Sequence, residues 1–291
     1  MRPLALILAV LFIVPQAQAQ IDWNTEEEDA QQQEREPQQG EVPLSHLGMS
    51  YALNIGVYFA NPATANYYNG SPNEPNSIMN LYNNPNTYAE IRDQYNGNDW
   101  YLDGNSLPLD MRYDRPMMFG VNLQYFWTET MGVFLDFNTA QLVSGGYVAV
   151  QVEDFTGPVM EQRIEPEEIW GEESRVHADL GFAYVVKNSS AVQPFVSAGI
   201  DFLYTEVKTN KVKFGNRTYT IFNQGLNENV NMPQGGMGLG WMFTPGVKLR
   251  LNAAFSADIG WNVYNTQVRL GDYKERNMNS ALYLRLVYYD F

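Results

Sequence analysis

From Leu47 onward, bulky apolar residues alternate with small or polar residues along the chain. In residues 47–59 the odd-numbered positions carry Leu, Met, Tyr, Leu, Ile, Val and Phe, whereas the even-numbered positions carry Gly, Ser, Ala, Asn, Gly and Tyr. Residues 117–127 repeat the pattern, with Met, Phe, Val, Leu, Tyr and Trp at the odd positions. A helix does not keep one apolar face with a period of two, whereas a strand does. Both segments are therefore predicted to be β-strands.

The same alternation predicts eight strands in all. The other six are expected at residues 132–150, 174–187, 193–206, 236–243, 247–264 and 278–291. The tight turns between strands are expected at residues 128–130, 188–190 and 244–246, and the long loops at 61–115, 151–173, 207–235 and 265–277. Because short and long connections alternate, an up-and-down barrel places all tight turns at one rim and all long loops at the other. The predicted fold class is therefore all-β, an eight-stranded antiparallel up-and-down β-barrel.

The charge-free strands indicate which face of this barrel is outside. Neither residues 47–60 nor residues 117–128 contain a charged side chain. A soluble barrel such as a lipocalin needs charge on its outward face. The bulky apolar positions are therefore predicted to face lipid and the small polar positions to face the lumen. Apolar-out, polar-in strands of about 10 residues are typical of transmembrane β-barrels of outer membranes, in which closure satisfies every backbone hydrogen bond.

Strand parity then predicts the positions of charged and aromatic side chains. A luminal polar network is expected to contain Asp136, Arg175, His177, Asp179, Asp201, Lys248, Arg250 and Asp258. Aromatic side chains that mark the two membrane interfaces are expected beside the tight turns at Trp127, Tyr184, Trp241 and Phe243, and near the long loops at Phe59, Tyr204 and Trp261. Eight strands enclose a space that side chains can fill, and opposite charges there should pair. A plugged core is therefore favoured over a conducting pore.

Two segments precede the predicted barrel. Residues 1–19 have a positive charge at Arg2, an apolar run at 4–14 and the sequence Ala17-Gln18-Ala19, which together are typical of a secretory signal peptide. The apolar run is too short for a membrane-spanning helix, which needs about 20 residues. Residues 20–46 contain eight acidic residues, one Arg and runs of Gln, so they are predicted to be an acidic disordered tether. The alternative is a docking segment for a partner protein.

Composition excludes several function classes. The 291 residues carry a net charge of −15 and no Cys, which excludes disulfides and thiolate chemistry and argues against nucleic acid as a partner. His46 and His177 are the two histidines, so a multi-histidine metal site is excluded, and no cofactor or metal is expected. His177 and Asp179 share one inward face but lie about 7 Å apart along the strand, too far for a direct hydrogen bond. No catalytic residues are expected, and the protein is predicted not to be an enzyme.

A resemblance follows from these features. The signal peptide, the alternation, the eight strands and the final sequence LYLRLVYYDF resemble the small outer-membrane β-barrel family, which includes the OmpA barrel, OmpX and PorT-like proteins, over residues 47–291. The resemblance implies the outer membrane of a Gram-negative bacterium, a periplasmic N-terminus and a role for Phe291 as an assembly signal. One departure concerns the last strand, where Leu282–Tyr288 have bulky residues of opposite parity to Tyr289 and Phe291. Either a bulge intervenes or one of these two sets faces the lumen.

The long loops are expected to carry any specificity. Residues 61–115 hold 12 Asn and 7 Tyr, chemistry that suits either a binding surface or a lid over the barrel mouth, and a short helix is expected at 86–92 with its cap at Asn86 or Thr87. The acidic loop at 151–173 is predicted to pair with the basic loop at 207–235, which should turn at Gly215-Asn216.

The predicted function is a non-enzymatic outer-membrane protein, structural or surface-interacting, whose extracellular loops contact a protein or a glycan. The alternatives are a subunit or accessory of an outer-membrane secretion or assembly complex, with an outer-membrane or periplasmic protein as its partner, and a narrow solute channel. Outer-membrane lipid is an expected partner in each case.

Overall fold

The structure is a computed structural model that describes residues 47–71, 77–102, 105–154, 161–186, 191–223 and 234–290. The predictions of a signal peptide, an acidic tether, a tight turn at 188–190 and an assembly signal at Phe291 lie outside these residues.

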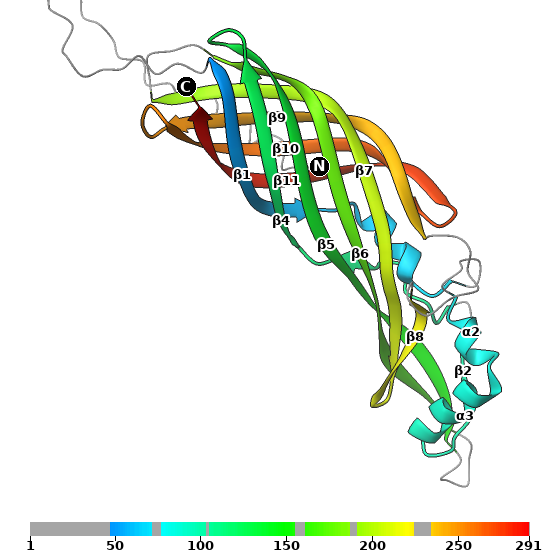
Figure 1. Ribbon diagram of the computed structural model, residues 1–291. Coiled ribbons are helices and arrows are strands. Elements are labelled where there is room, and N and C mark those ends of the chain that lie inside the picture. The colour runs from blue at the N-terminus through cyan, green and yellow to red at the C-terminus, as the bar shows by residue number, and fades with distance from the viewer. Residues whose placement is uncertain are drawn as a thin grey trace, which may run out of the picture. The chain divides into compact units, whose positions relative to one another are not determined.

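Eight long strands form one closed antiparallel ring (Figure 1). They are β1 (Gly48–Phe59), β4 (Met117–Phe126), β5 (Met131–Asp154), β6 (Glu161–Val185), β7 (Val192–Phe214), β9 (Gly235–Arg250), β10 (Phe255–Leu270) and β11 (Tyr273–Asp290). Each strand pairs with the next along the chain, and β1 pairs with β11 to close the ring. The predicted fold class, an eight-stranded up-and-down barrel, is confirmed.

Three of these strands continue well past the barrel. β5, β6 and β7 contain 24, 25 and 23 residues, whereas about 9–11 residues are enough to cross a membrane. Their far ends, together with the described parts of loop one (residues 60–116) and β8 (Arg217–Asn223), form what is called here the lobe (Figure 1). Loop one contributes η1 (Pro62–Tyr68), α2 (Met79–Tyr82), α3 (Pro85–Gln94), β2 (Trp100–Tyr101) and β3 (Arg112–Tyr113).

The predicted turn at 244–246 is wrong. β9 runs without interruption from Gly235 to Arg250, and the turn to β10 lies at residues 251–254. Pro245 has no N–H to donate, and the ladder with β10 skips from the Gly246–Gly260 pair to the Phe243–Val263 pair. The Thr-Pro-Gly sequence therefore marks a gap in the ladder within a strand, although its composition is typical of a turn.

The predicted long loop at 265–277 is wrong for a related reason. β10 extends to Leu270, and β11 begins at Tyr273, so the two strands form a hairpin with Gly271-Asp272 as its turn. Gly271 has φ +55°, a left-handed conformation that glycine adopts without strain. Polar outward residues at the end of this hairpin concealed the strand period, because the hairpin projects beyond the apolar part of the barrel.

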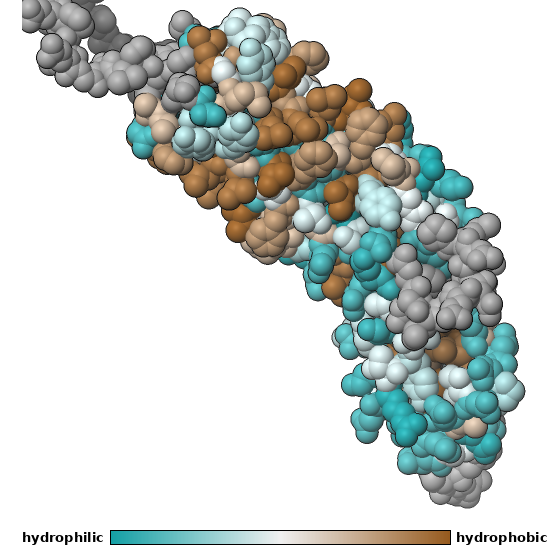
Figure 2. Space-filling model, viewed as in Figure 1, coloured by the Kyte–Doolittle hydropathy of each residue, from teal (hydrophilic) through white to brown (hydrophobic). Residues whose placement is uncertain are grey.

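The outer surface of the barrel is apolar, as the alternation predicted. Leu53, Val121 and Leu251 are all exposed, whereas Asn54 and Asn122, from the opposite parity, are buried. Outward positions become polar toward the lobe at Ser174 on β6 and Glu206 on β7, and at Arg115, which precedes β4. Figure 2 shows this change on one face, with brown residues covering the barrel and mostly teal residues covering the lobe.

Among the described residues, no helix combines the length and the hydropathy that crossing a membrane requires.

The register of β11 shows which of its bulky side chains face the lumen. Its pairings with β1 and β10 run without a shift in register, so no bulge intervenes. Leu282, Leu284, Leu286 and Tyr288 are exposed on the outside. Tyr289 is buried and faces the lumen, together with Arg285.

Two smaller predictions need correction. Trp241 and Phe243 are exposed on the outside, but they lie eight and more residues from the turn at 251–254, because β9 is longer than predicted.

The helix in loop one is found as α3, but its N-cap is Asn84, whose side chain accepts hydrogen bonds from the backbone N–H groups of residues 86 and 87. Pro85 at the first helical position shifts the start toward the N-terminus.

Candidate functional site

The candidate site is the interior of the barrel, where polar side chains from all sides converge. Of the eight residues proposed for a luminal network, seven are buried: Asp136, Arg175, His177, Asp179, Asp201, Lys248 and Asp258. Arg250 is partly exposed at the end of β9, next to the turn. The buried seven do not form one continuous network but belong to separate groups at different levels of the barrel.

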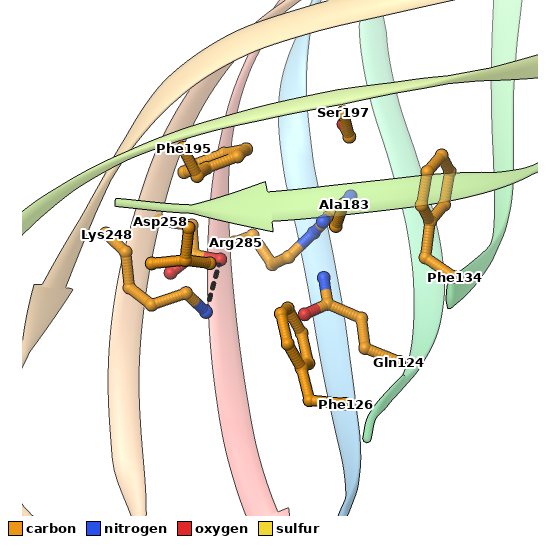
Figure 3. A pocket seen from close by; sticks show the side chains of 10 residues that line it. Gln124, Phe126, Phe134, Ala183, Phe195, Ser197, Lys248, Asp258 and Arg285 are labelled. Atoms are coloured by element: carbon orange, nitrogen blue, oxygen red, sulfur yellow. Dashed lines mark ion pairs between the residues drawn. The ribbon is translucent and has the colours of Figure 1, made fainter. Parts of the chain in front are cut away.

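The group nearest the tight turns is centred on Lys248 (Figure 3). Its Nζ lies 3.0 Å from Asp258 Oδ2 and donates a hydrogen bond to Tyr289 Oη at 2.9 Å. Ser256 Oγ lies 2.9 Å from the same Tyr289 oxygen. The cavity beside this group leaves about 10 Å³ for the centre of a water molecule, which is room for one. Phe126, Phe134 and Phe195 line the cavity, so apolar rings fill the lumen at this end.

A second group lies deeper and is centred on Arg285. Its Nη2 lies 2.5 Å from Asp136 Oδ2, and its Nε donates to Asn54 Oδ1 at 2.7 Å. Asn54 Nδ2 in turn donates to Asp136 Oδ1 at 2.6 Å. Arg285 also lies over the ring of Tyr283, 4.7 Å from its centroid. The carboxylate of Asp136 is therefore satisfied by a charged and a neutral donor, as a buried charge requires.

The third group contains the histidine. His177 Nδ1 lies 3.0 Å from Asp201 Oδ1, and His177 Nε2 lies 3.1 Å from Tyr58 Oη. The imidazole stacks on Tyr264 with ring centroids 4.2 Å apart. Thr266 donates a hydrogen bond to the other oxygen of Asp201. The acid that contacts His177 is thus Asp201 on the neighbouring strand, while Asp179, two residues along, does not hydrogen-bond to the ring.

Arg175 occupies the mouth of the barrel and is completely buried. Its Nε lies 2.6 Å from Glu173 Oε1, and its Nη2 donates to Thr64 Oγ1 at 2.9 Å. Glu173 Oε2 accepts hydrogen bonds from Tyr68 Oη at 2.6 Å and Tyr113 Oη at 3.1 Å. Thr64, Tyr68 and Tyr113 all come from loop one. This ion pair therefore holds η1 and β3, called here the cap, against the inner wall of the barrel.

Beyond the cap, the lobe has a hydrophobic core of its own. Trp100 is fully buried there and stacks on Tyr88 with ring centroids 5.3 Å apart. Val148, Val150 and Val152 of β5 also belong to this core. Tyr95 donates a hydrogen bond to Glu167 Oε1 at 2.8 Å. Burial, followed by that contact with Glu167, raises the pKa of Tyr95 above its ordinary value. The described parts of loop one are thus folded, and they share a packed core with the strands.

A shallow groove lies on the outer side of the lobe. It is lined by Pro108, Asp110, Arg112, Gly145, Gly146, Tyr147 and Glu168. Tyr147 is 68% exposed, which is high for an aromatic residue in a strand. The glycine at 145 leaves open space where a side chain would stand. One aromatic face beside acidic and basic groups is an arrangement that can bind a polar molecule.

The predicted pairing of loop two with loop three is present at one position. Lys211 Nζ lies 4.0 Å from Glu172 Oε1, across the β6–β7 pair, and both side chains are partly exposed. Lys208 instead pairs with Glu206 on its own strand, and Arg163 pairs with Glu165. The hairpin turn at Gly215-Asn216 is as predicted, between β7 and β8.

Sequence reasoning missed several luminal residues. Arg285 was missed because the parity of the last strand was ambiguous, and Glu173 because it was assigned to an acidic loop. Asn54 and Tyr58 were placed on the luminal face by their parity, but the sequence did not indicate their partners, and Thr266 lay in a segment predicted to be a loop. The cross-strand positions that join them to their partners depend on strand register, which the alternation does not specify.

Comparison with known proteins gives no matching family model and no matching curated protein. Solved structures that resemble this chain include Neisserial surface protein A, at 9% identity over 83% of this chain and 96% of that one, with a TM-score of 0.41. OprG from Pseudomonas aeruginosa matches at 12% identity over 84% of this chain and 96% of that one, with a TM-score of 0.38. Ail of Yersinia pestis, solved with the heparin analogue sucrose octasulfate, matches at 13% identity over 84% and 100%, with a TM-score of 0.34. At these values the likeness carries no argument.

The class of the protein follows from its own structure. Eight strands close into a ring, so their backbone groups bond within the ring, and the outward side chains of these strands are apolar. Hydrocarbon tolerates such a closed barrel and excludes open sheet edges. The chain is therefore a small transmembrane β-barrel of the outer-membrane class.

Proposed function

We propose that this protein is a non-enzymatic surface-interaction protein of the outer membrane of a Gram-negative bacterium. The barrel anchors the chain in lipid, and the lobe faces the outside and binds an extracellular protein or glycan. The N-terminus would then lie in the periplasm, because β1 enters the barrel at the rim that carries the tight turns.

The filled lumen is the observation that carries this proposal. Buried groups centred on Lys248, Arg285, His177 and Arg175 occupy successive levels, and the cap closes the mouth. A barrel of eight strands has little interior beyond what its side chains fill. Solute conduction would require breaking several buried ion pairs, each of which is costly to disrupt. The exposed part of the lobe is then the surface at which function resides.

The extent of the lobe supports the same proposal. Most connections in compact domains have about 4–6 residues, and loops on a rigid scaffold commonly carry binding residues. Here the described parts of loop one pack into a hydrophobic core that they share with the barrel strands, and three strands extend to support them. A rigid platform lowers the entropic cost of binding because the surface is already in its binding conformation. The groove at Tyr147 is the part of this platform that we assign to ligand contact.

The test displays the full-length protein on bacterial cells and measures their binding to arrays of glycans and of extracellular proteins. Wild-type cells are expected to bind at least one class of array component, and Tyr147→Ala is expected to reduce that binding by tenfold or more, in line with the loss of one aromatic anchor worth about 1.4 kcal/mol or above. Tyr101→Ala is the matched control, since Tyr101 is another exposed lobe tyrosine outside the groove.

Two results would contradict the proposal. Displayed wild-type protein that binds no more than cells with an empty vector would remove the surface-interaction role. A stoichiometric membrane protein co-purifying with the barrel from mild detergent, with no array binding, would favour the accessory role in a secretion or assembly complex.

A further inference from the structure

Three side chains that can bind a metal ion lie close together in the lumen. His177 and Asp179 lie on the inward face of β6, and Asp201 lies opposite Asp179 on β7. His177 Nδ1 is 3.0 Å from Asp201 Oδ1. One ligand atom from each of the three residues lies within 4.8 Å of the others, and all three residues are buried.

Asp179 gives independent reason to expect a cation here. Its exposed fraction is 0%, and as an ionised carboxylate it accepts no hydrogen bond from the described residues, so a hydrogen bond to Asp201 requires a proton between the two acids. Its cross-strand neighbours on both sides, Asp136 and Asp201, are also acids. A buried carboxylate without a partner is strongly unfavourable.

The charged side chains near Asp179 already pair with other acids. Arg285 and Asn54 contact Asp136, and His177 and Thr266 contact Asp201. The cations Lys248 and Arg175 pair with Asp258 and Glu173. Asp179 therefore faces two other acids with no cation of its own, so the repulsion between the carboxyl groups must be offset either by a proton shared with Asp201 or by a cation bound at this point.

The ligand set indicates the kind of cation. One imidazole and two carboxylates suit divalent first-row transition ions, whereas Ca²⁺ and Mg²⁺ take oxygen ligands. With a neutral imidazole, two carboxylates and one divalent ion sum to zero net charge. Two ligands of a tetrahedral Zn²⁺ stand about 3.4 Å apart. The 3.0 Å between His177 Nδ1 and Asp201 Oδ1 nearly fits this value, and Asp179, within 4.8 Å of both, can complete the set by a small side-chain movement.

We propose that His177, Asp179 and Asp201 bind a divalent transition ion, such as Zn²⁺, inside the barrel. Outer contacts already orient two of the three ligands. Tyr58 lies at hydrogen-bond distance from His177 Nε2, which leaves Nδ1 to face the carboxylates, and Thr266 holds the second oxygen of Asp201. Such outer contacts are typical of metal-binding histidines and carboxylates. The ion would link β6 to β7 at the middle of the lumen and would have a structural role.

The test refolds the full chain in detergent with a chelator, with Zn²⁺ or with Co²⁺, then removes free metal and measures bound metal by mass spectrometry. Wild-type protein is expected to retain about one Zn²⁺ per chain, and the Co²⁺ form is expected to show visible d–d absorption that Zn²⁺ abolishes. Asp179→Asn is expected to weaken Zn²⁺ binding by at least about tenfold, since even the loss of a group that only orients a ligand costs 10–100-fold.

Asp258→Asn is the matched control, because Asp258 is another buried luminal aspartate but is held by Lys248 away from the three ligands. Asp110→Asn, on the lobe, is a second control that does not alter the lumen. Both are expected to retain Zn²⁺, with folding monitored by the mobility of unheated samples on SDS gels.

The proposal is overturned if folded wild-type protein retains less than about a tenth of an ion per chain, which would mean that a proton on Asp179 serves in place of the metal. It is also overturned if Asp179→Asn retains Zn²⁺ as the wild type does. Should Asp179→Asn fail to fold, the wild-type stoichiometry and the Co²⁺ spectrum decide the matter by themselves.

Discussion

At the scale of single residues, Arg285 joins several side chains in the middle of the lumen. It is the charged partner of Asp136 and also contacts Asn54 and the ring of Tyr283. Breaking a buried ion pair from one side is more destabilising than removing both partners, because the remaining charge stays buried. The stability of this level of the barrel is therefore expected to depend on both partners together.

Replacing Arg285 by Met should lower the free energy of unfolding by about 3–5 kcal/mol, because Asp136 is left charged and unpaired. The double variant Arg285→Met with Asp136→Asn should recover most of this loss. Urea unfolding in lipid vesicles, followed by tryptophan fluorescence, measures both values. Arg276→Met, an exposed position on the same strand, serves as the control. A double variant no more stable than the single one would show that the two side chains act independently.

At the scale of the strands, β9 shows how a local sequence signal can mislead. Thr244-Pro245-Gly246 has the composition of a turn, yet β7 pairs with all three positions on one side. The actual turn at 251–254 contains Asn252, whose side chain accepts hydrogen bonds from the backbone N–H groups of Ala254 and Phe255. Side-chain capping of this kind is typical of Asx turns.

The two candidate turns can be distinguished by insertion. A short epitope inserted between Asn252 and Ala253 should leave the barrel folded, because loop tips tolerate insertions. The same epitope between Pro245 and Gly246 should prevent folding, since it would interrupt a strand within the membrane. Heat-modifiable migration on SDS gels and the yield of outer-membrane protein report the result. Equal yields for both insertions would contradict the assignment of residues 244–246 to the interior of a strand and of the turn to 251–254.

The contact between the cap and β6 depends on a glycine. A Cβ at Gly171 would overlap the ring of Tyr68, which donates its hydroxyl to Glu173. Gly171→Val should therefore displace the cap and increase proteolytic cleavage within residues 60–116 by roughly tenfold, the equivalent of about 1.4 kcal/mol of local stability. Limited proteolysis of the detergent-folded protein measures the cleavage rate.

Gly145→Val provides the comparison for this substitution, because a Cβ at Gly145 meets nothing within 4 Å. Its cleavage rate should equal that of the wild type. If both valine variants were cleaved at the same rate, the Tyr68 contact would not be what retains the cap.

At the scale of the whole described barrel, the outward and inward faces of the strands carry different kinds of side chain. Apolar residues cover the outside of the strands, and paired charges fill the inside at several levels. The cap and the lobe are built on three strands that extend beyond the membrane part. The result is a barrel with a filled interior and a folded lobe at one end of it.

The filled interior predicts that the barrel does not conduct ions. In planar lipid bilayers the wild-type protein should show no stepwise conductance, and Gly171→Val should also stay silent, because the groups around Arg285 and Lys248 lie below the cap and remain in place. Porins of 16–18 strands provide the positive control. Reproducible conductance steps from the wild-type barrel would support the channel alternative.

The sequence by itself determined which face of each strand meets lipid. Alternation with a period of two is a local property of the chain. The sequence therefore predicts that Leu53 faces outward and Asn54 faces the lumen even when their partners on the neighbouring strands are unknown. The absence of charge from the outward positions then distinguished a membrane barrel from a soluble one. Seven of the eight charged or titratable residues assigned to the inside by parity are buried in the structure.

Only the tertiary structure decided which of these side chains meet. His177 contacts Asp201 and not Asp179, and Arg175 meets a loop residue more than 100 positions away, because contact across strands depends on register and on the path of loop one. Alternation is unchanged when a strand slips by two residues, so it cannot specify register. The cap, the isolated Asp179 and the continuity of β9 are consequences of that register, which long-range pairing in the closed barrel establishes.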